Sequence, residues 1–382
     1  MPARRALIIV LAALLLAAVP GTATAGRRAP RGFYGVSWDA SLSSRPEPDQ
    51  ERQWDLMARS GVESTRVVFS WAAAQPTLRG PIDFAPSDRL VARAAARGIE
   101  LLPTVFDTPR WAQLDVNRRN SPPRYPSDYA AYLRALVARY GPHGSFWTSR
   151  PDVPRHPIRT WQIWNEPDLA FYWNVPSDRS AAWPGGYIQL LQAARRAIKS
   201  RDRNAKVVLA GLSSAPWTQL RRLYRRGARR LFDVVAIHPY ASGPNDAMGA
   251  VRAVRAVMRR NRDGRKPIWV TELGWPAARG KLRLDGGLRR LVTTDRGMAG
   301  RIRSVYEAML RRRRDRRYGV QRLYWFTWAS SYEPGGEGGI WNFAGLVAAP
   351  PGSFKPTPSL AAYRASARRG EGCAKTTRGS CR

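Results

Sequence analysis

Short apolar runs alternate with amphipathic, helix-like segments along almost the whole chain. Most runs are rich in β-branched and aromatic residues, have the length of a buried strand, and precede a segment with helical periodicity. Strands that alternate with helices pair in parallel through right-handed crossovers. Eight such units with no linker between them predict a closed (β/α)8 TIM barrel in a single domain. The runs are Phe33–Trp38, Ser64–Trp71, Ile99–Phe106, Thr160–Trp164, Lys206–Ala210, Phe232–His238, Pro267–Glu272 and Arg322–Trp328.

The first 25 residues have the composition of a secretory signal. Arg4 and Arg5 precede an apolar stretch from Leu7 to Val19, and a small-residue cleavage pattern ends at Ala25. This apolar stretch is too short to span a bilayer comfortably, which favours a cleaved signal over a retained anchor. We therefore expect a secreted or extracytoplasmic protein, with a signal peptide at 1–25, a barrel domain at 30–365 and a polar tail at 366–382.

Both cysteines of the chain lie in that polar tail. Cys373 and Cys381 are eight positions apart, a spacing that suits a local disulfide in an exported protein. The histidines are scattered at His143, His156 and His238, and no grouping of metal ligands is visible. The sequence predicts neither a metal site nor a cofactor.

Two of the apolar runs end at a glutamate. Glu166 follows Asn165 in the stretch RTWQIWNEPD, and Glu272 lies in the stretch KPIWVTELGW. The C-terminal ends of barrel strands meet at one face, where active sites of this fold are built. Hydrolysis of a glycosidic bond requires a pair of carboxyl groups, one as an acid and one as a nucleophile or base. One glutamate at a strand end is commonly a solvated residue, but two at matching ends, the first flanked by Trp161 and Trp164, indicate a catalytic pair.

Three loops that follow strand ends are longer than a barrel needs: Asp107–Arg124, Leu169–Trp183 and Ser330–Lys355. They are rich in aromatic side chains, which can stack on the apolar C–H faces of sugar rings. We expect Trp111 and Trp173 of these loops to contact the substrate, with ordinary core packing as the alternative.

These segments resemble clan A of the glycoside hydrolases, which are retaining enzymes on a (β/α)8 barrel. Within the clan the chain is most similar to family 39 and to cellulase-like bacterial proteins of family 5. The resemblance covers roughly residues 33–345 and is carried by TRVVFSWAAAQP, LLPTVFDTPRWA, WQIWNEPD, DVVAIHPYA and PIWVTELGW. The pairing of WNEP with TELGW is specific for the clan and only weakly specific for one family.

The resemblance implies roles for particular residues. Glu166 would be the general acid/base and Glu272 the nucleophile of a double displacement. Asn165 would hold the sugar 2-hydroxyl. Arg66 matches the buried arginine of the clan, and such a cation would keep Glu272 ionised.

Further along the chain, His238 and Tyr240 match residues that hydrogen-bond around the nucleophile and the substrate. Trp328 is the expected platform under the sugar at the cleavage point, with Trp325 as the alternative, since the two cannot both face inward on a regular strand. The chain departs from the family pattern at Asp168, where Asn is common, and at Gln75, where Glu is frequent.

The net charge of +36 is large, and only six of the 64 basic residues are lysine. Such a charge draws a protein towards polyanions. Two rival functions therefore stand beside the hydrolase: a carbohydrate-binding barrel without catalysis and an envelope polyanion-binding protein. No aromatic-studded basic groove or recognition motif suggests a nucleic-acid partner. We expect a monomer that acts on a polysaccharide or oligosaccharide.

Basic residues cluster at the predicted helix ends that precede strands. Helix-to-strand junctions of a (β/α)8 barrel lie opposite the active site, so these clusters predict a cationic face there, in electrostatic contact with an anionic cell envelope. The clusters are Arg195–Lys206, Arg221–Arg230, Arg259–Lys266 and Arg311–Arg317.

Overall fold

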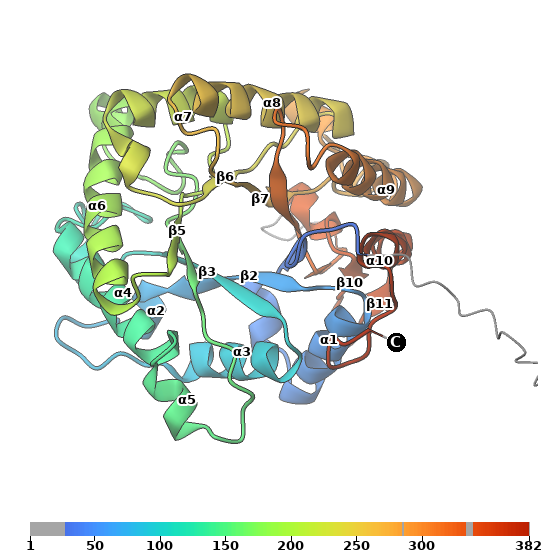
Figure 1. Cartoon of the computed structure of the whole chain (residues 1–382), viewed down its shortest axis with the longest axis horizontal. Helices are drawn as coiled ribbons and strands as arrows, with labels where there is room; N and C mark the ends of the chain where they lie inside the picture. The colour runs from blue at the N-terminus through green and yellow to red at the C-terminus, as the bar shows by residue number, and fades with distance from the viewer. Residues whose placement is uncertain (1–26, 285, 334–338, 382) are drawn as a thin grey trace, which may run out of the picture.

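The computed structural model describes residues 27–284, 286–333 and 339–381. The predicted signal peptide at 1–25 therefore lies outside the described residues. Eight parallel strands curl into a barrel, and helices surround it (Figure 1). The barrel strands are β1 (Tyr34–Ser37), β2 (Ser64–Ser70), β3 (Glu100–Phe106), β4 (Thr160–Ile163), β5 (Lys206–Val208), β6 (Val235–Ile237), β7 (Ile268–Leu273) and β8 (Val320–Trp325).

The first and last barrel strands, β1 and β8, pair with each other in the middle of the sheet, whose two ends are β5 and β6. Tyr34 of β1 lies opposite Leu323 of β8, and the strand order is β5-β4-β3-β2-β1-β8-β7-β6. An isolated parallel bridge between Val208 and Val234 connects β5 to the approach of β6. The predicted (β/α)8 barrel is confirmed, and each predicted apolar run overlaps one strand.

The helices cover the outer surface of the barrel and connect successive strands (Figure 1). Several begin with proline in the first turn, where a missing N–H is tolerated because that N–H has no intrahelical partner. The helices are α1 (Glu47–Arg59), α2 (Trp71–Ala74), α3 (Ala85–Ala96), α4 (Pro126–Tyr140), α5 (Ser145–Ser149), α6 (Trp183–Arg201), α7 (Pro216–Arg225), α8 (Pro244–Arg260), α9 (Asp295–Arg311) and α10 (Pro358–Glu371).

The loop after β8 folds into a small sheet of its own. Here β9 (Ala329–Ser330) pairs in parallel with β10 (Val347–Ala348), and β10 pairs antiparallel with β11 (Lys355–Pro356). Ser330 Oγ accepts a hydrogen bond from Gly345 N and donates one to Asn342 O, which holds the two arms of the loop together.

The barrel interior changes character from its N-terminal to its C-terminal end. Near the N-terminal end Arg322 stacks on Trp269 and pairs with Glu100. Towards the C-terminal ends, which we call the top face, the polar side chains of Arg66 and Gln162 point inward and meet. The apolar cluster that fills the interior consists of Leu102, Val208, Val234, Ala236, Trp269 and Tyr324.

The C-terminal helix is part of the barrel domain. Helix α10 lies beside α9 (Figure 1), and Ser366 O accepts a hydrogen bond from Tyr34 Oη of β1 at 2.7 Å. Gly370 O accepts bonds from two backbone N–H groups of the first described residues, those of Arg28 and Ala29. The predicted tail boundary at 366 is therefore wrong, because residues 366–371 are helical and largely buried against the barrel.

Cys373 and Cys381 follow α10 and are joined as a disulfide, with their Cα atoms 5.5 Å apart. None of the described helices is both long and apolar enough to cross a membrane.

Candidate active site

Glu166 and Glu272 lie together at the top face of the barrel. Glu166 comes directly after β4, and Glu272 is the fifth residue of β7. A carboxylate oxygen of each and a ring nitrogen of His238 all lie within 4.8 Å of one another. The glutamates are only 7% and 8% exposed, so both are largely desolvated yet each keeps an edge that a ligand can reach.

The backbone after β4 is bent sharply to bring Glu166 into this position. Trp164 and Glu166 both have positive φ angles, 71° and 40°, in the left-handed region that non-glycine residues rarely adopt. Such conformations cost about 1–3 kcal/mol each and persist where the surroundings impose them. The Trp164 indole is held by Tyr172 O, which accepts from its Nε1 at 2.8 Å, and by edge contact with Trp173. The aromatic residues around NEP thus fix the turn that presents Glu166.

Arg66 connects the two strands that carry the glutamates. Its guanidinium donates to Glu272 Oε1 at 2.7 Å, to Asn165 Oδ1 at 2.5 Å and to Gln162 Oε1 at 2.7 Å. Gln162 is itself fixed by Thr104, whose hydroxyl donates to the same oxygen. A planar guanidinium with several fixed partners leaves little freedom for any of the attached side chains.

Glu272 is surrounded by hydrogen-bond donors. Besides the Arg66 bond to Oε1, Tyr240 Oη donates to Oε2 at 2.9 Å. Each carboxylate oxygen therefore accepts a hydrogen bond from the protein, and the two bonds fix the orientation of the Glu272 side chain.

The environment of Glu166 favours the neutral carboxylic acid. Burial, and then the negative charge of Asp168, raise the pKa of Glu166 to about 8, against the lowering effect of Arg66. Asp168 in turn accepts backbone N–H bonds from Ser213 and Ser214. The environment of Glu166 thus differs from that of Glu272, which accepts hydrogen bonds from Arg66 and Tyr240.

His238 contacts Glu166 directly, with its Nδ1 at 2.7 Å from Glu166 Oε1. Burial lowers the pKa of His238 to about 3, and the Arg66 charge acts in the same direction. Because the imidazole is neutral and the Glu166 carboxyl is protonated, the O–H of Glu166 donates a hydrogen bond to His238 Nδ1. Its Nε2–H then donates to Thr271 Oγ1 at 3.0 Å. Gly211 makes room for this ring, because a Cβ at that position would lie 1.9 Å from His238 Nε2.

The structure therefore gathers Arg66, Asn165, Glu166, His238, Tyr240 and Glu272 into one network, and the roles that the resemblance implies for these residues stay predictions. Glu166, His238 and Glu272 also have the donor atoms and spacing of a metal-binding group. A positive charge is already supplied to Glu272 by Arg66, and both ring nitrogens of His238 already have hydrogen-bond partners. These contacts fit proton transfer better than ligation of a metal ion.

The expected tryptophan platform is wrong. Trp328 is fully buried, and its Nε1 donates to Gln53 Oε1 at 3.1 Å, so it has no face to offer a sugar. The alternative, Trp325, is equally buried and bonds to Ala344 O. Phe326, between them, is the partly exposed aromatic residue of this segment, and it packs edge-on against Trp341 at 5.4 Å.

The two tryptophans expected from the long loops take different positions. Trp173 is buried under Trp164 and beside Tyr187, where it supports the bent backbone rather than a ligand, so its expected substrate contact is wrong. Trp111 packs edge-on against Trp71, and its Nε1 donates to Gln75 O in the preceding loop. Because Trp111 is only partly buried, its substrate contact stays a prediction.

Other residues complete the site that the sequence did not single out. Tyr172 lies close enough to both glutamates that, after burial, their negative charges raise the pKa of its hydroxyl further. Trp341 stacks obliquely on Tyr240 at 4.9 Å and borders the site from the loop after β8. Gln162 and Thr271 fix Arg66 and His238 from within the strands. In the sequence, Gln162 and Thr271 could have been recognised only as polar residues inside otherwise apolar runs.

A hollow of about 390 Å³ lies next to the site, bordered by the loops after β3 and β4. Its aromatic lining is formed by Phe106, Phe171 and Tyr172, and Phe171 is 66% exposed. Asp107 and Asn120 supply polar groups along the same wall. The hollow offers both stacking surfaces and hydrogen-bonding groups beside Tyr172, which itself lies close to both glutamates.

Comparison with models of protein families gives no match, and comparison with curated proteins gives none. Solved structures with the same fold are numerous. A family 39 glycoside hydrolase from Bacteroides cellulosilyticus superposes with a TM-score of 0.66 at 17% identity, over 90% of this chain and 64% of that one. A monomeric beta-xylosidase from Caulobacter crescentus gives 0.63 at 19% identity, over 89% and 68% of the two chains.

A GH5_18 enzyme from Streptomyces cattleya, solved in complex with Manb1-4GlcNAc, gives a TM-score of 0.64 at 19% identity, over 89% of this chain and 81% of that one. The chain thus spans about two thirds of the first two neighbours and more of the third. The expected structural resemblance to family 39 and family 5 glycoside hydrolases is confirmed at the level of the fold.

Proposed function

We propose that the protein is a retaining glycoside hydrolase that cleaves β-linked glycosidic bonds of a polysaccharide or oligosaccharide by double displacement. The observation that carries the proposal is the pair of carboxyl groups at the top face, with oxygens within 4.8 Å of each other. Retaining enzymes hold their carboxyl groups about 5–5.5 Å apart, whereas inverting enzymes need about 6.5–9.5 Å to admit a water. The close pair therefore favours a covalent intermediate.

The different environments of the two glutamates support the assignment of their roles. In the first step the Glu272 carboxylate forms a bond to the anomeric carbon while the bond to the leaving oxygen breaks. Glu166 donates its proton to that oxygen. Arg66 and Tyr240 hold the attacking carboxylate in place, and Asn165, fixed by Arg66, is positioned for the sugar 2-hydroxyl.

In the second step Glu166, now ionised, takes a proton from a water whose oxygen attacks the anomeric carbon. The bond to Glu272 breaks, and both glutamates return to their starting states. The lone pair of neutral His238 Nδ1 faces the ionised Glu166 between the steps, which favours recapture of a proton.

The sugar at the cleavage point is not assigned by these contacts, and the structural neighbours include a beta-xylosidase and an exo-beta-1,4-mannosidase. The hollow beside Glu166 would accommodate a further sugar against Tyr172 and Phe171. Xylosides, glucans, mannans and exopolysaccharides are the candidate substrates. The monomeric state of the Caulobacter neighbour supports a monomer here.

The proposal is tested with a panel of aryl β-glycosides and polysaccharides, followed by variants on the best substrate. We expect proton NMR of the first product to show the β-anomer. Glu272→Ala should be inactive and should yield an α-glycosyl azide when azide is added. Glu166→Ala should retain the first step only for a very good leaving group.

A matched control is Glu307→Ala, since Glu307 is an exposed glutamate of α9 far from the top-face network. It should behave as the wild type. Sugar binding without turnover in the wild type would favour the non-catalytic carbohydrate-binding barrel. An initial α-anomer from a β-glycoside would contradict double displacement.

A further inference from the structure

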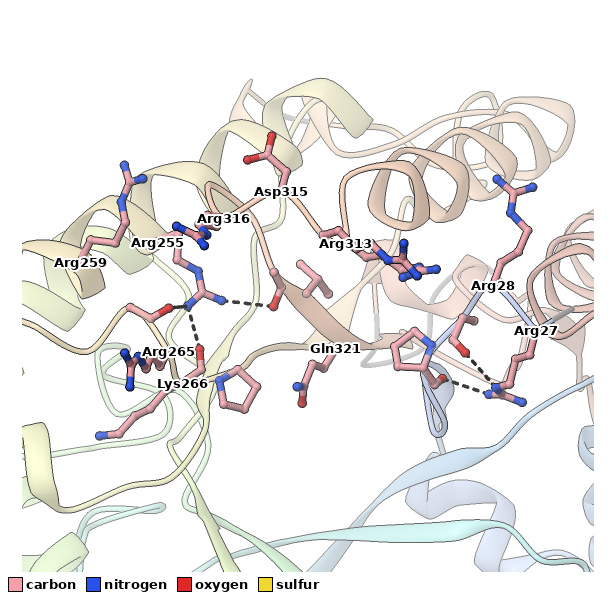
Figure 2. A pocket seen from close by; sticks show the side chains of 17 residues that line it. Arg27, Arg28, Arg255, Arg259, Arg265, Lys266, Arg313, Asp315, Arg316 and Gln321 are labelled. Carbon is pink, nitrogen blue, oxygen red and sulfur yellow. Dashed lines mark hydrogen bonds between the residues drawn. The ribbon is translucent and has the colours of Figure 1, made fainter.

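A large cavity lies at the opposite end of the molecule from the glutamates. Its volume is about 910 Å³, and it is bordered by the residues that precede β1, β7 and β8, so it opens on the face at the N-terminal ends of these strands, the bottom face. The first described residues, the C-terminal turns of α8, the loop between α8 and β7 and the loop between α9 and β8 form its walls (Figure 2). It is therefore separate from the proposed catalytic site.

The charged side chains that line this cavity are all cationic except for one carboxylate, that of Asp315. That carboxylate is already paired with Arg317, at 2.8 Å. Figure 2 shows the cationic side chains arranged around the cavity from all four segments. They are Arg27, Arg28, Arg255, Arg259, Arg265, Lys266, Arg313, Arg314 and Arg316.

Among the residues that the structure describes, most of these cations have no anionic partner. Arg27 pairs with Glu63, and Lys266 pairs with Asp263. Within the described part of the chain, no ion pair to a carboxylate is formed by Arg28, Arg259, Arg265, Arg313, Arg314 or Arg316. Six unpaired like charges around one cavity repel one another, and an anion placed between them would relieve that repulsion.

Arg255 shows that the cavity wall is built and not merely a set of solvated side chains. It is 4% exposed, and its guanidinium donates to the carbonyls of Tyr318, Gly264, Lys266 and Gly319 at 2.7–3.2 Å. Figure 2 shows the bonds to Gly264, Lys266 and Gly319, which join the two loops that border the cavity. Carbonyl dipoles fix this buried cation in place, but no carboxylate balances its charge.

The composition of the lining narrows the class of ligand. Arginine presents a planar fork of N–H donors that matches phosphate oxygens, and all but one of the cations are arginine. The lining contains no aromatic side chain, which is the usual stacking surface for single-stranded nucleic acid. A concave site also favours a chain that can enter it over a flat membrane surface. The volume lies within the range of about 300–1,000 Å³ for sites that enclose a ligand.

We propose that this cavity binds a linear oligophosphate, in which phosphate groups are linked directly to one another through anhydride oxygens. Two of the four predicted basic clusters, Arg259–Lys266 and Arg311–Arg317, supply much of the site. The cluster at Arg195–Lys206 is directed elsewhere, and its Arg195 and Lys199 both pair with Asp233. The proposed binding site is thus smaller than the cationic face that the four basic clusters of the sequence predicted.

The experiment is calorimetric titration of the full-length protein with sodium tripolyphosphate at increasing salt. We expect one ligand per chain and an affinity that falls steeply with ionic strength. Arg259→Gln combined with Arg313→Gln should lower the affinity at least tenfold, with each single change giving part of the loss. Circular dichroism at each step checks that the variants are folded.

The matched control removes the same charge from another helix end. Arg225→Gln with Arg226→Gln alters the end of α7 outside the cavity, and should leave the affinity within twofold of the wild type. Equal losses in both double variants, or no binding to the wild type, would overturn the proposal. Binding of phosphatidylglycerol vesicles or of a single-stranded oligonucleotide that depends on Arg259 and Arg313, without binding of tripolyphosphate, would overturn it in favour of those partners.

Discussion

The raised pKa of Glu166 makes the stability of the protein depend on pH in a direction that a single substitution can reveal. In the folded protein this carboxyl has a pKa of about 8, against a usual value of 4.5. Below about pH 4.5 both the folded and the unfolded chain hold the proton, and the group contributes nothing to the free energy of unfolding. Between pH 4.5 and 8 the unfolded chain releases the proton while the folded chain keeps it. Unfolding therefore becomes easier as pH rises.

The size of the effect follows from the two pKa values. Each pH unit in which only the folded state holds the proton lowers the free energy of unfolding by about 1.4 kcal/mol. Across the window from 4.5 to about 8 the loss approaches 5 kcal/mol as an upper bound. Local relaxation and water entry around an ionised Glu166 reduce this, so we expect about 2–5 kcal/mol.

Glu166→Gln removes the titration while keeping the contacts of the neutral acid. The amide can donate to His238 Nδ1, as the protonated carboxyl does. We expect the variant to have a stability close to that of the wild type at pH 5 and to exceed it by about 2–5 kcal/mol at pH 9. Urea denaturation followed by circular dichroism at pH 5, 7 and 9 measures the difference directly.

Taking the difference between wild type and variant cancels every other titrating group that the two proteins share. Glu307→Gln is the control, because Glu307 is 59% exposed and its neutralisation should not change the pH dependence. Parallel curves of unfolding free energy for wild type and Glu166→Gln from pH 5 to 9 would refute the reasoning. Such curves would mean that the pKa of Glu166 is not raised in the folded protein and that Glu166 is not kept protonated to act as an acid.

Two further predictions concern the same face of the barrel. Arg66→Met should destabilise the protein by about 3–5 kcal/mol, because it leaves a buried carboxylate without its cation. The same variant should not hydrolyse aryl glycosides. A stability in urea close to that of the wild type would contradict the ion pair between Arg66 and Glu272. Phe326→Ala should raise KM severalfold with little loss of stability. Trp328→Phe should instead lower the free energy of unfolding by about 1–3 kcal/mol and leave KM unchanged. If kinetics and denaturation showed the opposite pattern, Trp328 would again be the expected sugar platform.

The strands could be predicted because barrel strands are buried on both faces. Runs such as Ser64–Trp71 and Pro267–Glu272 therefore read as continuous apolar segments, and their ends locate the top face. The glutamate pair followed from this placement, since Glu166 and Glu272 mark the ends of two such runs. Arg66 stood out for the same reason, as a charged residue inside an apolar segment.

Side-chain direction beyond a strand end could not be read in this way. Strand β8 ends at Trp325, and the alternation that would orient Trp328 stops with it, so the wrong aromatic residue was chosen. Trp173 illustrates a second difficulty. Its loop has the composition of a substrate-binding segment, but the strained turn at Glu166 needs a packed support, and Trp173 provides it. Sequence composition does not distinguish these two uses of an aromatic ring.

The pairing of the first barrel strand with the last determines when the barrel can be completed. Strand β1 pairs with β8, Tyr34 bonds to the backbone of α10, and the backbone N–H of Arg28 bonds to Gly370. Strand β1 therefore lacks one of its two neighbours, and a nascent chain cannot close the ring, until β8 at Val320–Trp325 has been synthesised. Loop closure over so long a separation is slow, and partly assembled strands expose unpaired edges meanwhile. A chain truncated before α10 would keep every residue of the proposed catalytic network yet lose the segment that fastens its two ends.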